Sequence, residues 1–346
     1  SERIFLVAFD LSDRTVLVVG GAGYVGSVMV PLLLDAGASV RVLDQFVYDN
    51  GFSLAPVLDD PRVALHRGDL RDAAVFAEAA RGATDVVMLA SLVGDPVCKK
   101  YPELAQQVNA DATRAIIDSL DGLGVQRFVF TSTCSNYGIH DSATLADEES
   151  ELNPQSLYAR TKIEVEEHLL KSAASTDASM TVLRIATAYG LSPRMRFDLT
   201  VSQFAWEIAS GQDLLVFDAD TWRPYCHIRD ISKAVMTVLT AAPEKVRGEV
   251  FNVGDTEQCF TKRMIVEEVQ KHVPDAAVSY REGDTDPRNY RVSFAKITER
   301  LGFTVDHTVQ DYLAQLTTAV QAGVFPDVAG STRYGNYEVR HLEPRT

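Results

Sequence analysis

The sequence lacks closely spaced cysteines and long apolar runs. Its four cysteines are widely separated and form neither a Cys-x-x-Cys pair nor a metal-ligand spacing; they are Cys98, Cys134, Cys226 and Cys259. We therefore expect reduced thiols, as in a cytoplasmic protein, and no metal site. No apolar run approaches the roughly 18 residues of a membrane-spanning helix. The apolar run 4–9 is too short, and wrongly flanked, for a signal peptide.

Positive charge is also scarce. The 346 residues contain 33 Lys and Arg against 48 Asp and Glu, which gives a formal net charge of −15. Binding to a nucleic-acid backbone needs clustered Lys and Arg, so nucleic acid is excluded as a partner. An anionic ligand must instead be held by a few placed arginines and by backbone N–H groups.

The first half of the chain alternates short, Val-rich apolar runs with longer helical patterns. Unbroken apolar runs of this kind are typical of strands buried on both faces. The predicted strands cover 15–19, 40–43, 63–65, 85–90, 127–131 and 180–186, and the predicted helices cover 25–36, 73–81, 102–120 and 158–172. The alternation predicts an α/β fold with a doubly wound parallel sheet.

The pattern changes after about residue 190, where elements become shorter and 190–199 and 219–229 are predicted loops. We expect a first domain over 12–190 and a smaller α/β lobe over 191–325. A helical segment within 228–242 is expected to return to the first domain. Residues 326–346 are predicted to be a tail, either mobile or wrapped on the surface.

A glycine-rich stretch, Val18-Val-Gly-Gly-Ala-Gly-Tyr-Val-Gly26, follows the first predicted strand and opens a helix. In this context Gly20 permits a tight turn, Gly23 lets backbone approach a pyrophosphate, and Gly26 allows close packing of helix on strand. Tyr24 and Val25 stand at the helix N-terminus, whose partial positive charge favours phosphate. The stretch predicts a dinucleotide site, although a simple turn would have the same spacing.

Three further strand ends are candidates for the same site. Asp44 ends the second predicted strand, where a carboxylate can accept hydrogen bonds from an adenosine ribose and repel a 2′-phosphate. Because the next residue is Gln45 rather than Arg, NAD is favoured over NADP. Asp69 and Leu70 follow the third strand, where Asp69 either accepts from an adenine amino group or caps a solvated loop. The fourth strand ends in small or apolar residues that leave room for the cofactor backbone: Leu89, Ala90 and Ser91.

Tyr158 and Lys162 stand four residues apart in a predicted helix and therefore share one of its faces. An ammonium beside a phenol lowers the tyrosine pKa from its ordinary value of about 10, which yields a proton acceptor near neutral pH. An ordinary helical pair would show the same spacing. With the glycine stretch upstream, the pair predicts hydride transfer with a dinucleotide.

The fifth strand leads into Phe130-Thr-Ser-Thr-Cys-Ser-Asn-Tyr-Gly138. Together with the glycine stretch and Tyr-x-x-x-Lys, this run resembles the extended short-chain dehydrogenases/reductases. More narrowly, the chain is similar to the NAD-dependent nucleotide-sugar epimerases and dehydratases from about Thr15 to Phe303. The resemblance implies a Rossmann-type domain that binds NAD and a smaller C-terminal α/β lobe that binds a nucleoside diphosphate sugar.

The resemblance also implies roles for individual residues. Thr133 matches the catalytic Ser/Thr, Tyr158 the base, and Lys162 the lysine that binds the nicotinamide ribose. The resemblance further implies an active-site asparagine that binds the cofactor, Asn109, and two arginines on the substrate diphosphate, Arg223 and Arg288. A guanidinium suits a phosphate pair because it donates two parallel bonds. An asparagine would also fit as a helix cap, and the two arginines would also fit as members of surface ion pairs.

Two residues depart from the dehydratase pattern. The family's 4,6-dehydratases place Asp and Glu after the catalytic Thr, where this chain has Cys134 and Ser135. Because serine without a base cannot take a C5 proton, dehydration is disfavoured, and so are the decarboxylases that carry Glu at the second place. Ser135, like Thr133, is expected to contact the sugar. Cys134 is either a proton shuttle, since a thiol pKa of about 8.5 is tunable, or a small buried cysteine.

Three further residues near the expected substrate cleft are candidates for binding the substrate. Thr187 stands where many relatives have Asn to contact the diphosphate, and it keeps one hydroxyl donor. Arg194 and Arg196, in the predicted loop 190–199, are candidates for phosphate or sugar binding, or for holding the loop. His140 and His227 receive no catalytic role, since isolated histidines are more often structural.

The sequence thus predicts a nucleotide-sugar 4-epimerase that works through a transient 4-keto sugar, with Tyr158 as base aided by Thr133. A 4-ketoreductase, a dehydratase or decarboxylase, C3/C5 epimerisation with Cys134, and a non-catalytic NAD-binding protein stay open. The resemblance further implies a homodimer in which the helices 102–120 and 158–172 of each subunit form a four-helix bundle.

Overall fold

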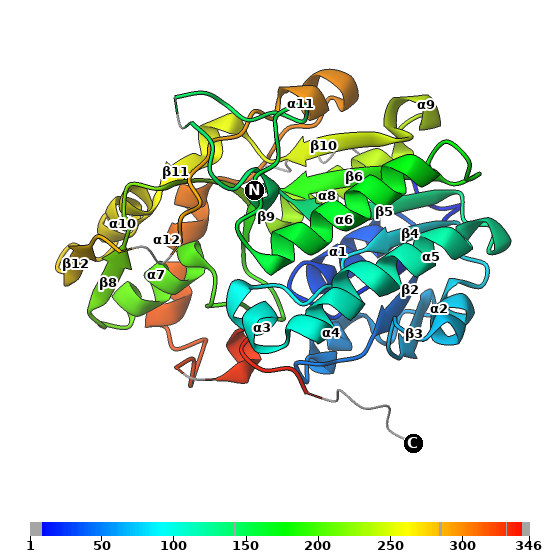
Figure 1. Cartoon of the computed structure of the whole chain (residues 1–346). Coiled ribbons are helices and arrows are strands. Elements are labelled where there is room, and N and C mark those ends of the chain that lie inside the picture. Colours follow the sequence, from blue (N-terminus) through cyan, green and yellow to red (C-terminus); the bar gives the residue numbers. More distant parts are fainter. Residues whose placement is uncertain (1–8, 142, 284–285, 330, 341–346) are drawn as a thin grey trace.

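The computed structural model describes residues 9–141, 143–283, 286–329 and 331–340. The predicted apolar run 4–9, except its last residue, and the last six residues of the predicted tail lie outside these ranges. The first domain is built on a seven-stranded parallel sheet of order β10-β6-β5-β4-β1-β2-β3 (Figure 1). Its strands are β1 (Thr15–Val19), β2 (Ser39–Asp44), β3 (Val63–Arg67), β4 (Asp85–Met88), β5 (Arg127–Thr133), β6 (Ser179–Ile185) and β10 (Glu249–Val253). The predicted Rossmann-type fold is confirmed.

Helices cover both faces of this sheet. Val16 and Val18 of β1 point to the face covered by α1 (Gly26–Asp35) and α8 (Ile228–Thr240), whereas Leu17 and Val19 point to the opposite face. The helices on that opposite face are α2 (Ala73–Ala80), α5 (Thr113–Ser119) and α6 (Leu157–Ser172). Because each strand is buried on both sides, its sequence is apolar at successive positions.

The second lobe lies on the left of Figure 1 and has two small sheets with three helices packed together. The sheets are β11-β9-β7 and β12-β8, with β7 (Thr187–Tyr189), β8 (Leu214–Phe217), β9 (Trp222–His227), β11 (Cys259–Thr261) and β12 (Val278–Arg281). The helices are α7 (Thr200–Ala209), α10 (Lys262–Gln270) and α12 (Val309–Gln321). The short helices are α3 (Asp95–Lys100), α4 (Pro102–Gln106), α9 (Pro243–Val246) and α11 (Ala295–Leu301).

Three local predictions differ from the structure. The predicted loop 219–229 contains strand β9, which pairs with β7 and β11. The sequence did not indicate a strand there because β9 contains a proline and polar residues. The predicted helix 102–120 is α4 and α5 joined by a π-helical turn, Gln107–Ala112. More of the chain than the predicted segment 228–242 returns to the first domain, because strand β10 also joins the large sheet.

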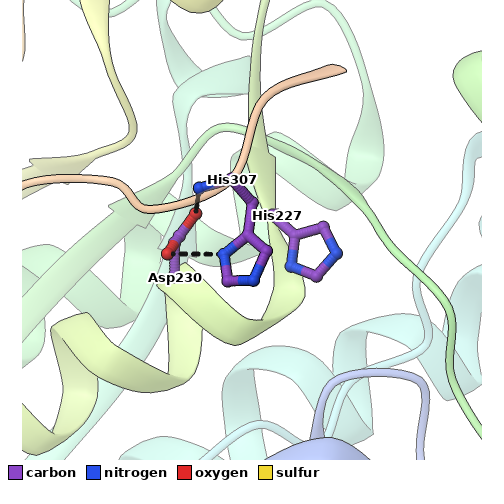
Figure 2. Close-up of side chains that lie close together, drawn as sticks. All are labelled: His227, Asp230 and His307. Atoms are coloured by element: carbon purple, nitrogen blue, oxygen red, sulfur yellow. Dashed lines mark hydrogen bonds and ion pairs between the residues drawn. The ribbon is translucent and has the colours of Figure 1, made fainter. Parts of the chain in front are cut away.

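His227 belongs to a structural junction between α8 and the segment that follows α11 (Figure 2). Its Nδ1 accepts from the Arg229 N–H and so caps α8, and its ring stacks on His307 with centroids 4.2 Å apart. Asp230 accepts from the His307 ring and from the backbone N–H groups of Asp306 and His307. Hydrogen bonds and ring stacking thus hold these three side chains together at the junction.

All four cysteines are buried and free, as expected from their spacing. Within the described ranges, no helix is both long and apolar enough to span a membrane.

Candidate active site

A cavity of about 720 Å³ opens at the carboxyl ends of the parallel strands, between the two lobes. The ends of β1, β2, β4, β5 and β6 line one side of it, and residues of the second lobe line the other. In the sheet order β4-β1-β2, the connections after β1 and β4 leave in opposite directions, and ligands of doubly wound sheets bind at this switch point.

The glycine stretch forms the turn between β1 and α1. Gly20 has φ +87°, and a Cβ there would lie 2.8 Å from the Ala90 N atom. A Cβ on Gly26 would lie 2.5 Å from the Gly20 carbonyl oxygen. A Cβ on Gly23 would meet only that same oxygen, at 3.2 Å, so a longer side chain there would enter the cavity. Tyr24 and Val25 line the cavity beside them, at the N-terminus of α1.

We expect Gly23→Val to weaken NAD binding roughly 100-fold, because the isopropyl group takes up space that the cofactor backbone needs. Isothermal titration calorimetry with NAD measures the effect, and circular dichroism checks the fold. Gly122→Val is the matched control, since a Cβ there has no neighbour within 4 Å among the described atoms. Equal NAD affinity in the Gly23 variant and the control would show that this turn does not hold the cofactor.

The ends of β2, β3 and β4 carry polar groups toward the cavity. Asp44 accepts from the Ala22 and Phe46 N–H groups, at 3.0 and 2.8 Å, and lines the cavity. Burial raises the pKa of Asp44, while these two bonds lower it. Asp69 also lines the cavity but is paired with Arg71 at 2.5 Å, and that pairing lowers its pKa against the effect of burial. The neighbouring lining residues predicted for the cofactor are Leu70, Leu89, Ala90 and Ser91.

Four buried polar atoms of the lining have no hydrogen-bond partner among the described residues. Arg223 Nη2 is held by its ion pair with Asp286, and the other three are Tyr48 OH, Asn50 Oδ1 and Ser91 Oγ. Buried polar groups are normally satisfied, so these atoms are available to a polar ligand. With the open glycine turn and the unused lone pairs of Asp44, they fit a dinucleotide.

Tyr158 and Lys162 both line the cavity, on α6, which Ser156 caps through the Ala159 N–H. The Lys162 ammonium lies 5.7 Å from the Tyr158 ring centroid and donates to the Thr131 carbonyl oxygen at 2.9 Å. Burial lowers the pKa of Lys162 to about 7 and raises the pKa of Tyr158. The Tyr158 pKa is thus raised where the sequence predicted that it would be lowered, because burial disfavours the charged phenolate.

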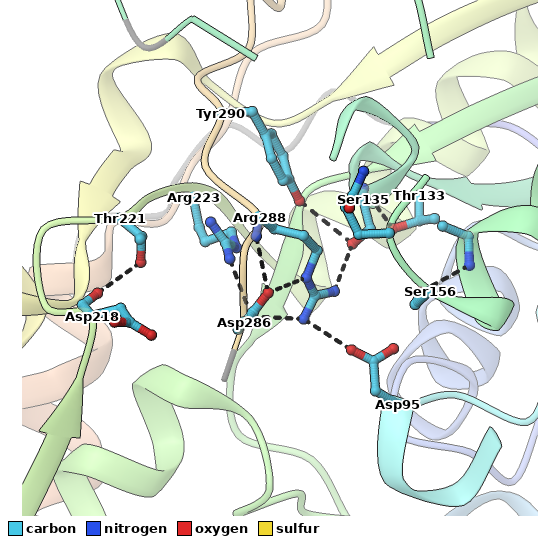
Figure 3. A network of polar contacts seen from close by, with 12 residues as sticks. Asp95, Thr133, Ser135, Ser156, Asp218, Thr221, Arg223, Asp286, Arg288 and Tyr290 are labelled. Atoms are coloured by element: carbon cyan, nitrogen blue, oxygen red, sulfur yellow. Dashed lines mark hydrogen bonds and ion pairs between the residues drawn. The ribbon is translucent and has the colours of Figure 1, made fainter. Parts of the chain in front are cut away.

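Thr133 and Ser135 face the cavity at the end of β5 (Figure 3). The Thr133 hydroxyl accepts from the Ser135 N–H at 3.1 Å. Cys134 between them is not among the described residues that line the cavity. Its thiol is buried and donates to the Arg184 carbonyl oxygen, and burial raises its pKa well above the ordinary value. The predicted role of Cys134 as proton shuttle is therefore corrected: the turn after β5 directs this side chain into the core.

The predicted diphosphate ligands are brought together, but with acidic partners that sequence analysis missed (Figure 3). Asp286 pairs with Arg223 at 3.1 Å and with Arg288 at 2.7 Å, and the two arginines hold the pKa of Asp286 well below its usual range despite burial. Arg288 also pairs with Asp95 at 3.2 Å and donates to Ser135 Oγ. The cluster is thus partly neutralised before any phosphate binds.

Arg194 and Arg196 line the cavity, yet both are already engaged. Arg194 donates to the Met195 and Gly335 carbonyl oxygens and to Asn336 Oδ1, and Arg196 forms two bonds with Asp198. The loop-holding interpretation of both residues fits these contacts. Thr187, on β7, lines the cavity as well.

Asn109 lies in the π-helical turn and is not among the described lining residues. Its amide accepts from the Leu92 N–H at 2.7 Å and donates to the Leu92 carbonyl oxygen at 3.1 Å. Its predicted direct contact with the cofactor is corrected: Asn109 holds the chain after β4, next to Ser91.

The family model "NAD dependent epimerase/dehydratase family" matches residues 16–254, more than half of the chain. The chain belongs to this family. The resemblance inferred from the motifs is confirmed, and NAD is the cofactor.

Family relatives with different activities match over similar lengths. A UDP-glucose 4-epimerase of Corynebacterium glutamicum is 30% identical over 84% of this chain and 91% of its own. A dTDP-glucose 4,6-dehydratase of Streptomyces niveus is 28% identical over 84% and 87%. The crystal structure of a dTDP-glucose 4,6-dehydratase from Streptomyces venezuelae with NAD bound superposes with TM-score 0.81 at 25% identity, over 90% of this chain and 99% of the other.

The polar cavity residues that the sequence did not indicate include Tyr48, Asp95, Lys262 and Asp286. Only Asp286 had a usable signal, since it stands two residues before Arg288 in a polar segment. Asp95 is the first residue of α3, and its pairing with Arg288 spans almost two hundred positions of sequence, which no local pattern reveals.

Proposed function

We propose that the protein is a nucleotide-sugar epimerase that acts at C4 through a transient 4-keto sugar, with a nucleoside diphosphate sugar as substrate. The two positions after Thr133 carry this proposal. Cys134 points into the core and Ser135 contacts Arg288 and Tyr290, so neither supplies the acid and base that the dehydratases place there. The 30% identity to a UDP-glucose 4-epimerase supports the same activity.

The remaining acids of the cavity do not replace that pair. The carboxylates among the described lining residues are Asp44, Asp69, Asp95, Asp198, Glu207 and Asp286. Each already accepts from an arginine, an amide or backbone N–H groups. Despite burial, arginine partners lower the pKa of Asp69, Asp198 and Asp286, so these carboxylates are weak bases for a C5 proton. Asp44 lies at the end of β2, where the adenosine is expected, Asp95 is paired with Arg288, and Glu207 accepts from Gln203.

The chain's own residues handle the proton and the substrate. Tyr158 takes the proton of the C4 hydroxyl and returns it, and the Thr133 hydroxyl shares the hydrogen bond to that oxygen. Bound NAD would supply the hydride chemistry at C4, with return of the hydride to the opposite face of the 4-keto sugar once that sugar has turned over. The positive charge of its oxidised ring would favour the tyrosinate. Arg223 and Arg288 exchange part of their bonding to Asp286 for the diphosphate. Lys162 holds the nicotinamide ribose.

Incubation with a panel of UDP-, GDP-, CDP- and dTDP-sugars, without added cofactor, tests the proposal. We expect proton NMR to show interconversion of 4-epimers of one sugar with no net change in NADH absorbance, because the hydride returns to the carbon it left. Loss of water in place of epimerisation would identify a dehydratase. A strict requirement for added NADH would identify a 4-ketoreductase, which would use the same Tyr158 and Thr133 in one direction.

C3/C5 epimerisation and non-catalytic NAD binding have less support in the cavity. C3/C5 epimerisation needs a proton shuttle, and the Cys134 thiol does not face the cavity. A non-catalytic NAD-binding protein has no use for a cavity that brings Tyr158, Lys162 and Thr133 together. Unchanged NMR spectra for every sugar of the panel, with NAD bound to the protein, would favour non-catalytic binding.

We further propose a cytoplasmic homodimer in which the helical segment 102–120 (α4, the π-helical turn and α5) and α6 of each subunit pair across a four-helix bundle. The two helices contact each other along the same face of the sheet (Figure 1). Analytical ultracentrifugation measures the oligomeric state.

A further inference from the structure

The chain returns to the first domain after α12. The C-terminal strap (residues 331–340) runs from the second lobe toward β2 and α3, as the red trace in Figure 1 shows. Its residues Asn336, Tyr337 and Val339 line the same cavity as the glycine turn. We propose that the C-terminal strap is part of the NAD site and retains the cofactor between turnovers.

The strap bridges the two strand ends on either side of the glycine turn. Asn336 donates through Nδ2 to the Val93 carbonyl oxygen, after β4, at 3.1 Å. The Arg340 N–H donates to the Val47 carbonyl oxygen, after β2, at 2.8 Å, and its guanidinium pairs with Asp49 at 2.6 Å. Since β1 lies between β4 and β2 in the sheet, the strap crosses over the turn where a pyrophosphate sits.

Two residues of the strap, Asn336 and Val339, are anchored in buried positions. Asn336 is 8% exposed, and besides Val93 it binds Arg194 at 2.9 Å and Asp198 at 3.2 Å. Val339 is 7% exposed and packs in a cluster that includes Leu92, Val97 and Cys98, with Tyr158 against its edge. The strap therefore also covers the side of the cavity where the catalytic tyrosine lies.

Arg194, which the sequence predicted as a candidate substrate ligand, contacts the strap. The Arg194 guanidinium donates hydrogen bonds to Gly335, to Asn336 and to its own loop. It also lies over the Tyr48 ring, with its central carbon 5.0 Å from the ring centroid. Arg194 thus links the strap to Tyr48, whose hydroxyl lines the cavity without a hydrogen-bond partner among the described residues.

Exchange of bound NAD tests the proposal in the full chain. The double variant Asn336→Ala/Val339→Ala, preloaded with radiolabelled NAD and chased with unlabelled NAD, should release label at least about tenfold faster than the wild type, because strap opening precedes release. Glu338→Gln is the matched control, since Glu338 makes only an exposed ion pair with Lys100 and should change the rate less than about twofold. A release rate in the double variant equal to that of the control would overturn the proposal.

A second measurement needs no variant. If the strap closes over NAD, then NAD must stabilise the closed strap by the same coupling free energy. Tryptic cleavage of the wild type after Arg333 and Arg340, followed by mass spectrometry, should slow at least about fivefold at saturating NAD. Equal cleavage with and without NAD would refute the strap's role. Both assays contain no sugar, so they rest only on NAD binding, and their failure would leave the epimerase proposal standing.

Discussion

Tyr158→Phe is expected to lower turnover about 1,000-fold while NAD remains bound, because removal of a positioned general base typically costs 100- to 10,000-fold. The phenol oxygen is the only atom lost, and Tyr158 packs beside Leu157 and Val339 through its ring. The sugar that responds in the panel above supplies the assay, and NAD content is measured by absorbance of the denatured protein.

Tyr101→Phe is the control for this substitution. Tyr101 packs at the edge of the same cluster as Tyr158 but is not among the described residues that line the cavity. It should therefore keep near-normal turnover. Activity of Tyr158→Phe within about tenfold of the wild type would remove Tyr158 as the base, since a general base is worth more than that.

Arg184→Leu is expected to lower the free energy of unfolding by about 3–5 kcal/mol, because it leaves the buried carboxylate of Glu166 without its counter-ion. Arg184 and Glu166 pair at 2.7 Å and are 5% and 2% exposed. Ser132 and Asn136 also donate to Glu166, so the pair ties β5 and β6 to the catalytic helix α6. Thermal unfolding followed by circular dichroism should show a Tm lower by roughly 5–15 °C.

Lys171→Ala on the same helix is the matched control for Arg184→Leu. Lys171 pairs with Glu167 at 4.0 Å, and both side chains are largely exposed. An exposed ion pair contributes about 0–1 kcal/mol, so the Tm should hardly change. If Arg184→Leu unfolds at the same temperature as this control, then Glu166 is not held as a charged group in the fold.

Much of the candidate site could be predicted from the sequence because it is built from local motifs. Gly20, Gly23 and Gly26 are required by the geometry of one turn, and the spacing of Tyr158 and Lys162 by one helical turn, so each pattern is complete within a few residues. The parallel sheet was predictable because burial on both faces leaves apolar residues at successive positions of each strand. The family comparison confirms the resemblance that these motifs suggested.

Other features depend on contacts between distant segments. From the Tyr-x-x-x-Lys spacing we expected a lowered Tyr158 pKa, whereas burial raises it. The spacing shows that the two side chains are close but does not show that they are buried. Strand β9 was missed because its pairing with β7 and β11, and not its own composition, makes it a strand.

The sequence by itself determined the sheet, the glycine turn, NAD and the pair Tyr158 and Lys162. Only the tertiary structure decided that Cys134 points into the core, that Asp286 pairs with both Arg223 and Arg288, and that Asn336, Tyr337 and Val339 line the same cavity as the glycine turn. The physical reason is the same in each case. Backbone geometry is local and leaves a pattern in neighbouring residues, whereas burial and charge pairing join side chains that lie far apart along the chain.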